Sequence, residues 1–172
     1  MGRFSVTVAA VCCASLLGIS SGFAQDLRGN ARGIERGPVD VAELTRRADL
    51  VVHGFVTGKS TTWIGRVIYT LYDVSVQETL KGVPRTSVVV AVAGGARGNV
   101  RLTVPGAPIL EIGEQFVAFA TTLQGATFTP VGTFDGVVRV NQGNGGGATV
   151  APRGRPESLN AFLQEVRAQG GR

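Results

Sequence analysis

The chain carries a single histidine, His53, which restricts the catalytic chemistry open to it. A Ser–His or Cys–His site needs a nucleophile, a base and an orienting group, so His53 would have to be the base. No G-x-S-x-G nucleophile elbow is present. His53 shares the parity of Val51 and Phe55 in an alternating apolar stretch, which is typical of a packed or sheet-edge histidine. We therefore predict a protein that is not an enzyme.

Carboxylates are the remaining candidates for metal or acid–base chemistry: Asp73, Glu78, Glu111, Glu114 and Asp135. They are scattered and match no EF-hand spacing. Glu111 and Glu114 could pair as the two carboxylates of a glycosidase do. Glu114 follows a glycine at the start of an apolar stretch, however, which favours a turn carboxylate that accepts hydrogen bonds from nearby amides. The Gly-rich runs lack the Lys-Ser/Thr of a P-loop. We predict neither a metal nor a cofactor.

Lys59, Trp63 and Arg66 lie close together in the sequence, around Gly65, and are the best candidates for binding a partner. Aromatic and Arg side chains are preferred anchors at protein interfaces. Two interpretations remain open. The three residues form a partner-binding loop between the first two strands, or Trp63, the only tryptophan, packs over the end of the fold.

The first 24 residues have the pattern of a secretory signal peptide. Arg3 precedes an apolar run, and small residues stand at Gly22 and Ala24. The apolar run is shorter than the ~20 residues of a spanning helix, so we expect no membrane span once the signal is removed. Both cysteines lie within residues 1–24, so the mature domain relies on its core rather than on disulfides. We predict export to a bacterial periplasm or exterior.

The charge of the mature chain is mildly basic. Removal of Arg3 with the signal lowers the formal net charge from +5 to +4. Residues 25–37 are rich in Gly and Arg and predict a disordered leader. Nucleic-acid binding requires a dense basic stripe, whereas glycines interrupt the arginines of this leader. We therefore expect no nucleic-acid partner.

The elements that would position these residues begin with a short helix. Asp40, followed three residues later by Glu43, predicts a capping box for a helix that ends near Asp49. From residue 50 the apolar period changes to two, which predicts a first strand over 50–58. The polar segment that follows, up to Arg66, is expected to be a loop.

The run from Arg66 to Gly82 predicts a long central strand, because large apolar and polar residues alternate along it. One face is expected to carry Ile68, Thr70, Tyr72, Val74, Val76 and Leu80. Lys81 is expected to extend its charge to water. Long, bent strands are typical of small closed barrels, in which one strand serves both halves.

Further apolar stretches predict the rest of the sheet, with strands at 86–95, 99–104, 115–122, 126–131 and 136–140. Val100, Leu102 and Val104 are expected to face inward. The last two strands are expected to form a hairpin around Asp135-Gly136. The fold class predicted is mainly all-β, a small OB-like closed or partly open barrel of about six or seven strands over residues 38–140.

The end of the chain predicts a second helix after a Gly-rich linker at 141–155. The helix is expected over 156–168, packing an apolar stripe on the barrel. The stripe consists of Leu159, Phe162, Leu163 and Val166. Glu157 in the first turn and Arg167 in the last would match the helix dipole.

Three motifs carry a resemblance to known proteins: Leu80-Lys81-Gly82, the "PGAP" run from Pro105 to Pro108, and Gly113-Glu114 before an apolar strand. The chain resembles a group of small uncharacterised bacterial secreted proteins that share these features. More distantly, it is similar to netrin-like domains, the OB-type barrel of tissue metalloproteinase inhibitors. That family inhibits through an N-terminal cysteine on the catalytic zinc, whereas this mature chain would begin at Gln25 and contain no cysteine. The resemblance implies the barrel and the compartment, not the inhibitory residues.

The sequence thus predicts an exported, non-catalytic β-barrel that binds a protein or an envelope polymer through Lys59, Trp63 and Arg66. An inhibitor or chaperone of an exported peptidase is one alternative. A carboxylate-dependent hydrolase is the other, and the single histidine and the scattered acids disfavour it.

Overall fold

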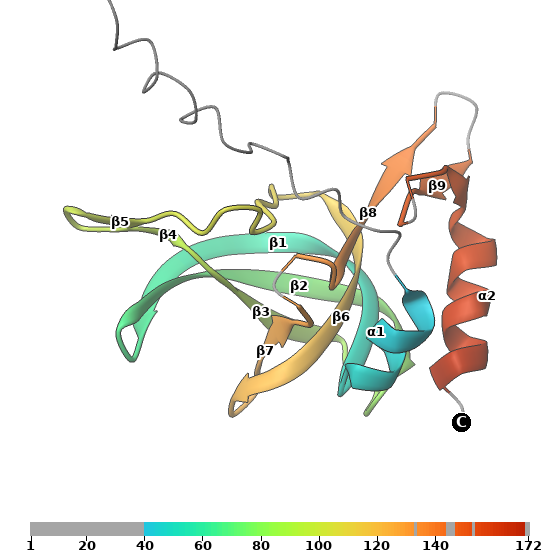
Figure 1. Ribbon diagram of the computed structural model, residues 1–172, viewed down its shortest axis with the longest axis horizontal. Helices are drawn as coiled ribbons and strands as arrows, with labels where there is room; N and C mark the ends of the chain where they lie inside the picture. The colour runs from blue at the N-terminus through green and yellow to red at the C-terminus, as the bar shows by residue number, and fades with distance from the viewer. Residues whose placement is uncertain (1–39, 133, 144–146, 153, 171–172) are drawn as a thin grey trace, which may run out of the picture. The chain divides into compact units, whose positions relative to one another are not determined.

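The computed structural model describes residues 40–132, 134–143, 147–152 and 154–170. They belong to one compact unit, Arg36–Arg172. It is mainly β, as predicted, with a helix near each end (Figure 1). The predicted signal peptide (1–24) and leader (25–37) lie outside the described residues.

The first helix, α1 (Val41–Arg47), begins where the sequence predicts. The carboxylate of Asp40 accepts hydrogen bonds from the main-chain N–H groups of Ala42 and Glu43, at 3.0 and 3.3 Å. This is the arrangement of an N-cap. Glu43 pairs with Arg46 at 2.5 Å rather than closing the predicted capping box. The helix and its cap are therefore confirmed, and the reciprocal half of the box is replaced by an ion pair.

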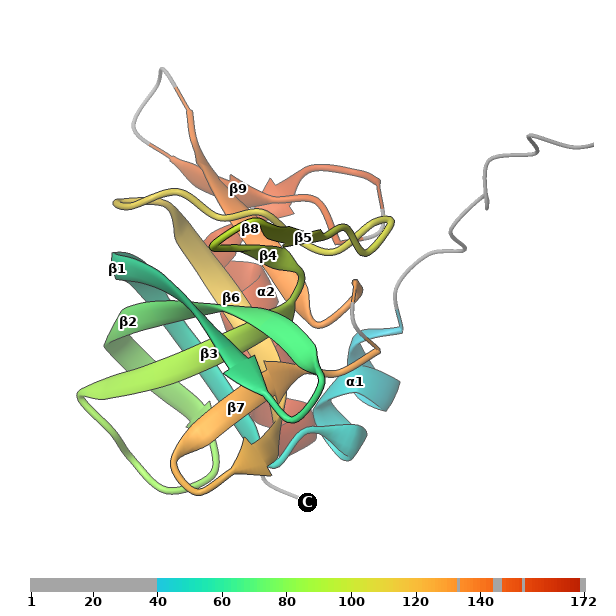
Figure 2. The same ribbon diagram turned by 90° about the vertical axis from the view of Figure 1, so that its left-hand side faces the viewer.

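Five strands close into a barrel: β1 (Leu50–Ile64), β2 (Val67–Lys81), β3 (Ser87–Ala93), β6 (Gln115–Gln124) and β7 (Thr127–Pro130). They pair in the order β1–β2–β3–β7–β6, and β6 pairs back onto β1. Only the β3–β7 pair within this ring is parallel. The ring, which can be followed in Figure 2, is a small OB-like barrel as predicted, with five strands in place of the six or seven expected.

The large sheet continues beyond the ring. β8 (Val137–Gln142) pairs with β6, and β9 (Ala148–Val150) and β10 (Glu157–Ser158) follow. The predicted hairpin between 126–131 and 136–140 is wrong. β7 and β8 do not pair with each other: both lie on the edge of β6 opposite β1, β8 along Phe116–Ala118 and β7 along Ala120–Gln124.

The segment predicted as a Gly-rich linker contains sheet structure. β8 extends through Asn141 and Gln142, and β9 returns along it. The physical reason is Val150, which is fully buried and packs in an apolar cluster beneath the C-terminal helix. Burying this side chain against the helix brings β9 beside β8.

A third prediction that fails concerns residues 94–104. β4 (Gly95–Arg97) and β5 (Val100–Leu102) pair only with each other in a separate two-stranded sheet. Val100, Leu102 and Val104, expected to face inward, are exposed or half-buried, with Val100 at 49 % exposure. Because this hairpin does not join the barrel sheet, its alternation does not direct side chains into the barrel core.

The long alternating run is confirmed as a central, half-buried strand. β1 and β2 each span 15 residues and pair along almost their whole length. Ile68, Thr70, Tyr72 and Val74 are buried on one face of β2, as predicted.

Two apolar clusters hold the domain. The first fills the barrel and draws on all five ring strands, with Val52, Tyr72, Val90, Phe116 and Phe128 among its members. The second lies between the outside of the sheet and the helices, with Val51, Phe119 and Phe162 among its members. Alternate residues at the start of β1 and along Phe116–Ala120 of β6 therefore serve different clusters, which explains why these parts of the two strands show no polar face.

The C-terminal helix, α2 (Leu159–Gly170), packs its predicted stripe as expected, and all four stripe residues are buried. Phe162 meets Phe119 edge to face, with ring centroids 6.3 Å apart. The helix begins three residues later than predicted, because Glu157 pairs with Val150 as part of β10 instead of entering the first turn. Among the described residues, no helix has the length and apolarity to cross a membrane.

Candidate functional site

The segment predicted as a binding loop is instead the end of a long hairpin. β1 continues through Lys59 and Trp63, and a two-residue turn of Gly65 and Arg66 leads into β2. Gly65 has a φ of +61°, as a two-residue hairpin turn of the primed type requires. Two of the three predicted binding residues therefore lie on a strand, and only Arg66 lies in a turn, where it is exposed.

A β-bulge decides which way Lys59 and Trp63 face. The β1–β2 register shifts between Val56 and Gly58, which leaves Thr57 as the extra residue. One extra residue reverses the alternation of faces along a strand. Before the bulge, even-numbered residues face the barrel interior, and after it odd-numbered residues do. Lys59 and Trp63 thus continue the face that Val56 occupies.

Three cross-strand pairs line this face: Lys59 opposite Tyr72, Thr61 opposite Thr70, and Trp63 opposite Ile68. Facing neighbours of this kind are the contact unit of a sheet. Ile68 is fully buried, whereas Trp63 is 45 % exposed. This is the exposure of a partly covered surface side chain rather than of a buried lid over the barrel.

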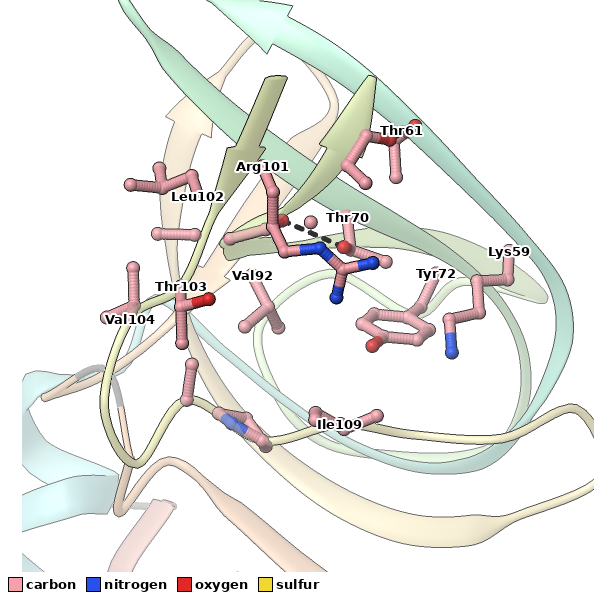
Figure 3. Close-up of a pocket in the computed structure, with 16 residues that line it drawn as sticks. Lys59, Thr61, Thr70, Tyr72, Val92, Arg101, Leu102, Thr103, Val104 and Ile109 are labelled. Carbon is pink, nitrogen blue, oxygen red and sulfur yellow. Dashed lines mark hydrogen bonds between the residues drawn. The ribbon is translucent and has the colours of Figure 1, made fainter. Parts of the chain in front are cut away.

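A cavity of about 420 Å³ opens over the first two of these pairs. One wall comes from β1, β2 and the end of β3, and the other from residues 101–109, which lead from β5 towards β6 (Figure 3). Of the three predicted binding residues, Lys59 lines this cavity, and Trp63 and Arg66 lie outside its lining.

The chain passes unusually close to β1 and β2 at the back of the cavity. Thr70 and Thr61 donate hydrogen bonds from their hydroxyls to the main-chain oxygens of Gly94 and Ala96, at 2.8 and 2.9 Å. Gly95 has a φ of +132°, and a Cβ there would stand 2.7 Å from Thr70 Oγ1. Glycine is required at this position both by the positive φ and by the lack of space for a Cβ.

Lys59 is held at the rim of the cavity. Its ammonium donates to the main-chain oxygen of Leu110 at 3.2 Å and pairs with the Glu111 carboxylate at 3.3 Å. It also lies 5.7 Å from the centroid of the Tyr72 ring, within cation–π distance. These contacts fix the ammonium beside the cavity and partly neutralise it.

Arg101 supplies a second cation, which the sequence interpretation missed. It belongs to β5, it is exposed, and its guanidinium extends into the cavity towards Thr70 and Tyr72 (Figure 3). Within the described part of the chain, this guanidinium has no hydrogen-bond or ion-pair partner. No acidic side chain is among the residues that line the cavity.

Tyr72 presents a further donor to the cavity. Its phenolic oxygen accepts a hydrogen bond from the main-chain N–H of Leu110 at 3.2 Å. A phenol is both donor and acceptor, so the O–H hydrogen remains available. The Tyr72 residue is only 2 % exposed, and its hydroxyl is thus a fixed, largely desolvated group in the cavity wall.

The two carboxylates considered as a catalytic pair are both engaged in structural contacts. Glu114 accepts a hydrogen bond from the main-chain N–H of Glu111 at 2.9 Å and pairs with Arg139 at 2.5 Å. The prediction that Glu114 is a turn carboxylate is confirmed. Across the described ranges, no three His, Cys, Asp or Glu side chains gather closely enough to hold a metal ion.

His53 is a packed histidine within the sheet, one of the two placements predicted. It is 7 % exposed, and its Nε2 lies 2.8 Å from the side-chain nitrogen of Gln115. Gln115 also bonds Gln77 and Gln142, at 2.7 Å each. Burial lowers the pKa of His53, and the nearby Glu78 carboxylate partly opposes this shift. The neutral imidazole is therefore part of a network of amides.

No protein-family model matches the chain, and no curated protein is significantly similar to it. An assignment of function therefore rests on the structural features described above.

Proposed function

We propose that the domain is an exported, non-catalytic binding module that captures a protein partner with the end of the β1–β2 hairpin and the adjoining cavity. The observation that carries the proposal is the placement of Trp63. It is 45 % exposed and shares a strand face with an open cavity. Aromatic side chains at the edge of a concave site are typical anchors of protein interfaces.

A second exposed apolar residue supports the same surface. Ile109 lines the cavity on the wall opposite β1 and β2 and is 66 % exposed. Large apolar side chains that flank a concavity favour a contact surface over an ordinary solvated one. Arg66 at the turn and Arg101 in the cavity add positive charge to the same end of the hairpin.

The chemistry of the cavity favours a protein over an envelope polysaccharide. Sugar hydroxyls are donors as well as acceptors, and carboxylate oxygens are the strongest acceptors for them. No Asp, Glu, Asn or Gln is among the residues that line this cavity. Its polar side chains are hydroxyls and cations, and the rest of its lining is apolar.

We propose a non-catalytic role because the side chains that could act as catalytic acids or bases are held in structural contacts. His53 bonds to an amide network, and Glu111 and Glu114 pair with Lys59 and Arg139. Export rests on the pattern of residues 1–24. Mass spectrometry of the protein from its native host tests it, and we expect the mature chain to begin at Gln25.

Site-specific photo-cross-linking in the native host tests the binding surface. A benzophenone amino acid replaces Trp63 in one variant and Thr62 in the other. Thr62 is the matched control, because it is adjacent in β1 and belongs to the opposite face of the strand.

We expect a protein adduct from position 63 and none from position 62. Equal adducts at both positions, or none at either, would overturn the proposed surface. An adduct that resists proteases and is degraded by polysaccharide lyases would assign the partner to the envelope polymers instead.

A further inference from the structure

The charged and phenolic groups that face the cavity are donors, whereas the hydroxyls of Thr61 and Thr70 already donate to main-chain oxygens. The guanidinium of Arg101 extends into it without a partner among the described residues (Figure 3). The Tyr72 hydroxyl accepts from Leu110 and keeps its own hydrogen to donate. Thr103 adds an exposed hydroxyl on the opposite wall. A ligand that satisfies these groups must offer acceptors, and the charge on Arg101 favours an anion.

The shape of the donor favours a carboxylate. A guanidinium is planar and presents parallel N–H groups that match the two oxygens of a carboxylate. The rest of the cavity is lined by apolar side chains, among them Val92, Leu102, Val104 and Ile109. The ligand therefore carries its carboxylate on an apolar body.

From this combination we infer that the cavity binds the C-terminal carboxylate of a protein chain whose last side chain is apolar. A terminal residue presents a carboxylate and an apolar side chain from one Cα, whereas an internal Asp or Glu presents only the acid. The volume of about 420 Å³ lies in the lower part of the range of ~300–1,000 Å³ for small-ligand sites, and it suits a chain end rather than a folded segment. Capture of chain termini is an established mode of peptide recognition.

This inference rests on the proposed function, since it names the part of the protein partner that enters the cavity. Arg101 anchors the carboxylate, and the apolar wall holds the last side chain. Lys59, already engaged by Leu110 and Glu111, contributes its charge from the rim.

Calorimetric titration with four probes tests the inference directly. The first probe is N-acetyl-Ala-Ala-Ala-Leu with a free carboxylate, and the second is the same peptide as its C-terminal amide. The third is N-acetyl-Ala-Ala-Asp-Ala-amide, whose only carboxylate is internal, and the fourth is inorganic phosphate. We expect the free acid to bind at least about tenfold more tightly than each of the other three, because they lack the charge-assisted contact or the apolar terminal residue.

Two variants test whether Arg101 is the residue that binds the carboxylate. Arg101→Gln should weaken binding of the free acid by about tenfold or more and leave the melting temperature unchanged, because the side chain is exposed on a separate hairpin. Arg155→Gln removes the same charge from an exposed residue outside the cavity lining and should leave binding unchanged.

Three results would each overturn the inference: no binding by the free acid, equal binding by phosphate or by the internal carboxylate, or an Arg101→Gln variant that binds normally. These results are independent of the cross-linking at position 63. A protein adduct there, combined with failure of the peptides, would remove the carboxylate site and leave the proposed function standing.

Discussion

Lys81, the last residue of β2, closes the C-terminal end of α1 through the main-chain oxygen of Thr45. Its ammonium donates to that oxygen at 2.7 Å, to the oxygen of Ala48 at 2.7 Å and to that of Arg46 at 3.3 Å. The last carbonyls of a helix lack partners within it and carry the negative end of its dipole. A strand residue 33 to 36 positions away thus caps the first helix.

Lys81→Met should therefore lower the free energy of unfolding by about 1–3 kcal/mol, because hydrogen bonds to a charged group are lost while the length of the side chain is kept. Arg47→Met is the matched comparison. Arg47 belongs to the last turn of the same helix and is exposed, so its loss removes only a dipole interaction, worth about 0.3–1 kcal/mol at most. Urea denaturation measures both. Equal effects of the two substitutions would show that the hydrogen bonds from Lys81 contribute nothing beyond charge.

Strand β2 and its last residue, Lys81, show which features of the fold can be predicted from the sequence and which cannot. Alternation is a local property, and from Ile68 to Val74 it correctly predicts which face of β2 is buried. Leu80, predicted on the same face, packs instead in the cluster beneath the helices, because the β1–β2 register shifts before it. The Leu-Lys-Gly ending predicts only a strand end with a charge in water. The structure instead directs Lys81 to a helix formed by residues distant in the chain, and no local pattern encodes that contact.

The candidate site was also predictable only in part, because local patterns identify its residues but not their orientation. Composition and spacing identify Lys59, Trp63 and Arg66 as exceptional side chains, but their orientation depends on the bulge at Thr57. Gly58 within an alternating stretch was the available signal, since glycine inside a strand often marks a bulge. Arg101 could not be found in this way, because its hairpin is held at the cavity by hydrogen bonds from Thr61 and Thr70, which are distant in the chain.

The register of β2 is tested by a pair of adjacent substitutions. Val74→Asp places a carboxylate in the barrel interior, where Val74 is 1 % exposed. An unpaired charge there should cost several kcal/mol (roughly 3 or more), which is a large part of the stability of an ordinary domain. Ser75→Asp, on the outer and only half-buried face, should cost far less. Thermal melts followed by circular dichroism distinguish the two variants. Similar melting temperatures would show that the register assigned to β2 is wrong.

His53 makes a prediction about pH. Burial lowers its pKa in the folded protein from the ordinary value of 6.5, with Glu78 as the opposing charge. The unfolded chain therefore binds a proton more readily than the folded one below about pH 6.5. Stability should be fully present above this pH and should fall as the pH drops through 6.5 towards the folded pKa.

Urea denaturation at pH 7.5 and pH 5.5 measures this dependence, with a slope of at most about 1.4 kcal/mol per pH unit from one group. His53 is the only histidine, so His53→Gln should remove most of the slope in this interval. A wild-type protein that is equally stable at both pH values, or more stable at the lower one, would contradict the assignment.

Trp63→Ala decides between the two interpretations of the only tryptophan. If Trp63 anchors a partner, the substitution should leave the melting temperature nearly unchanged and weaken capture by about 2 kcal/mol, roughly thirtyfold. If it were a lid on the barrel, its removal would cost about 3–5 kcal/mol of stability. An exposure of 45 % beside the fully buried Ile68 favours the first outcome.

Thr62→Ala, on the other face, serves as the control for both measurements, because the cross-strand pairing of the hairpin is the same in each variant. A large drop in melting temperature specific to Trp63→Ala, with capture by the folded fraction unchanged, would remove the hairpin end as a binding surface and leave the cavity at Arg101 to be judged on its own titrations.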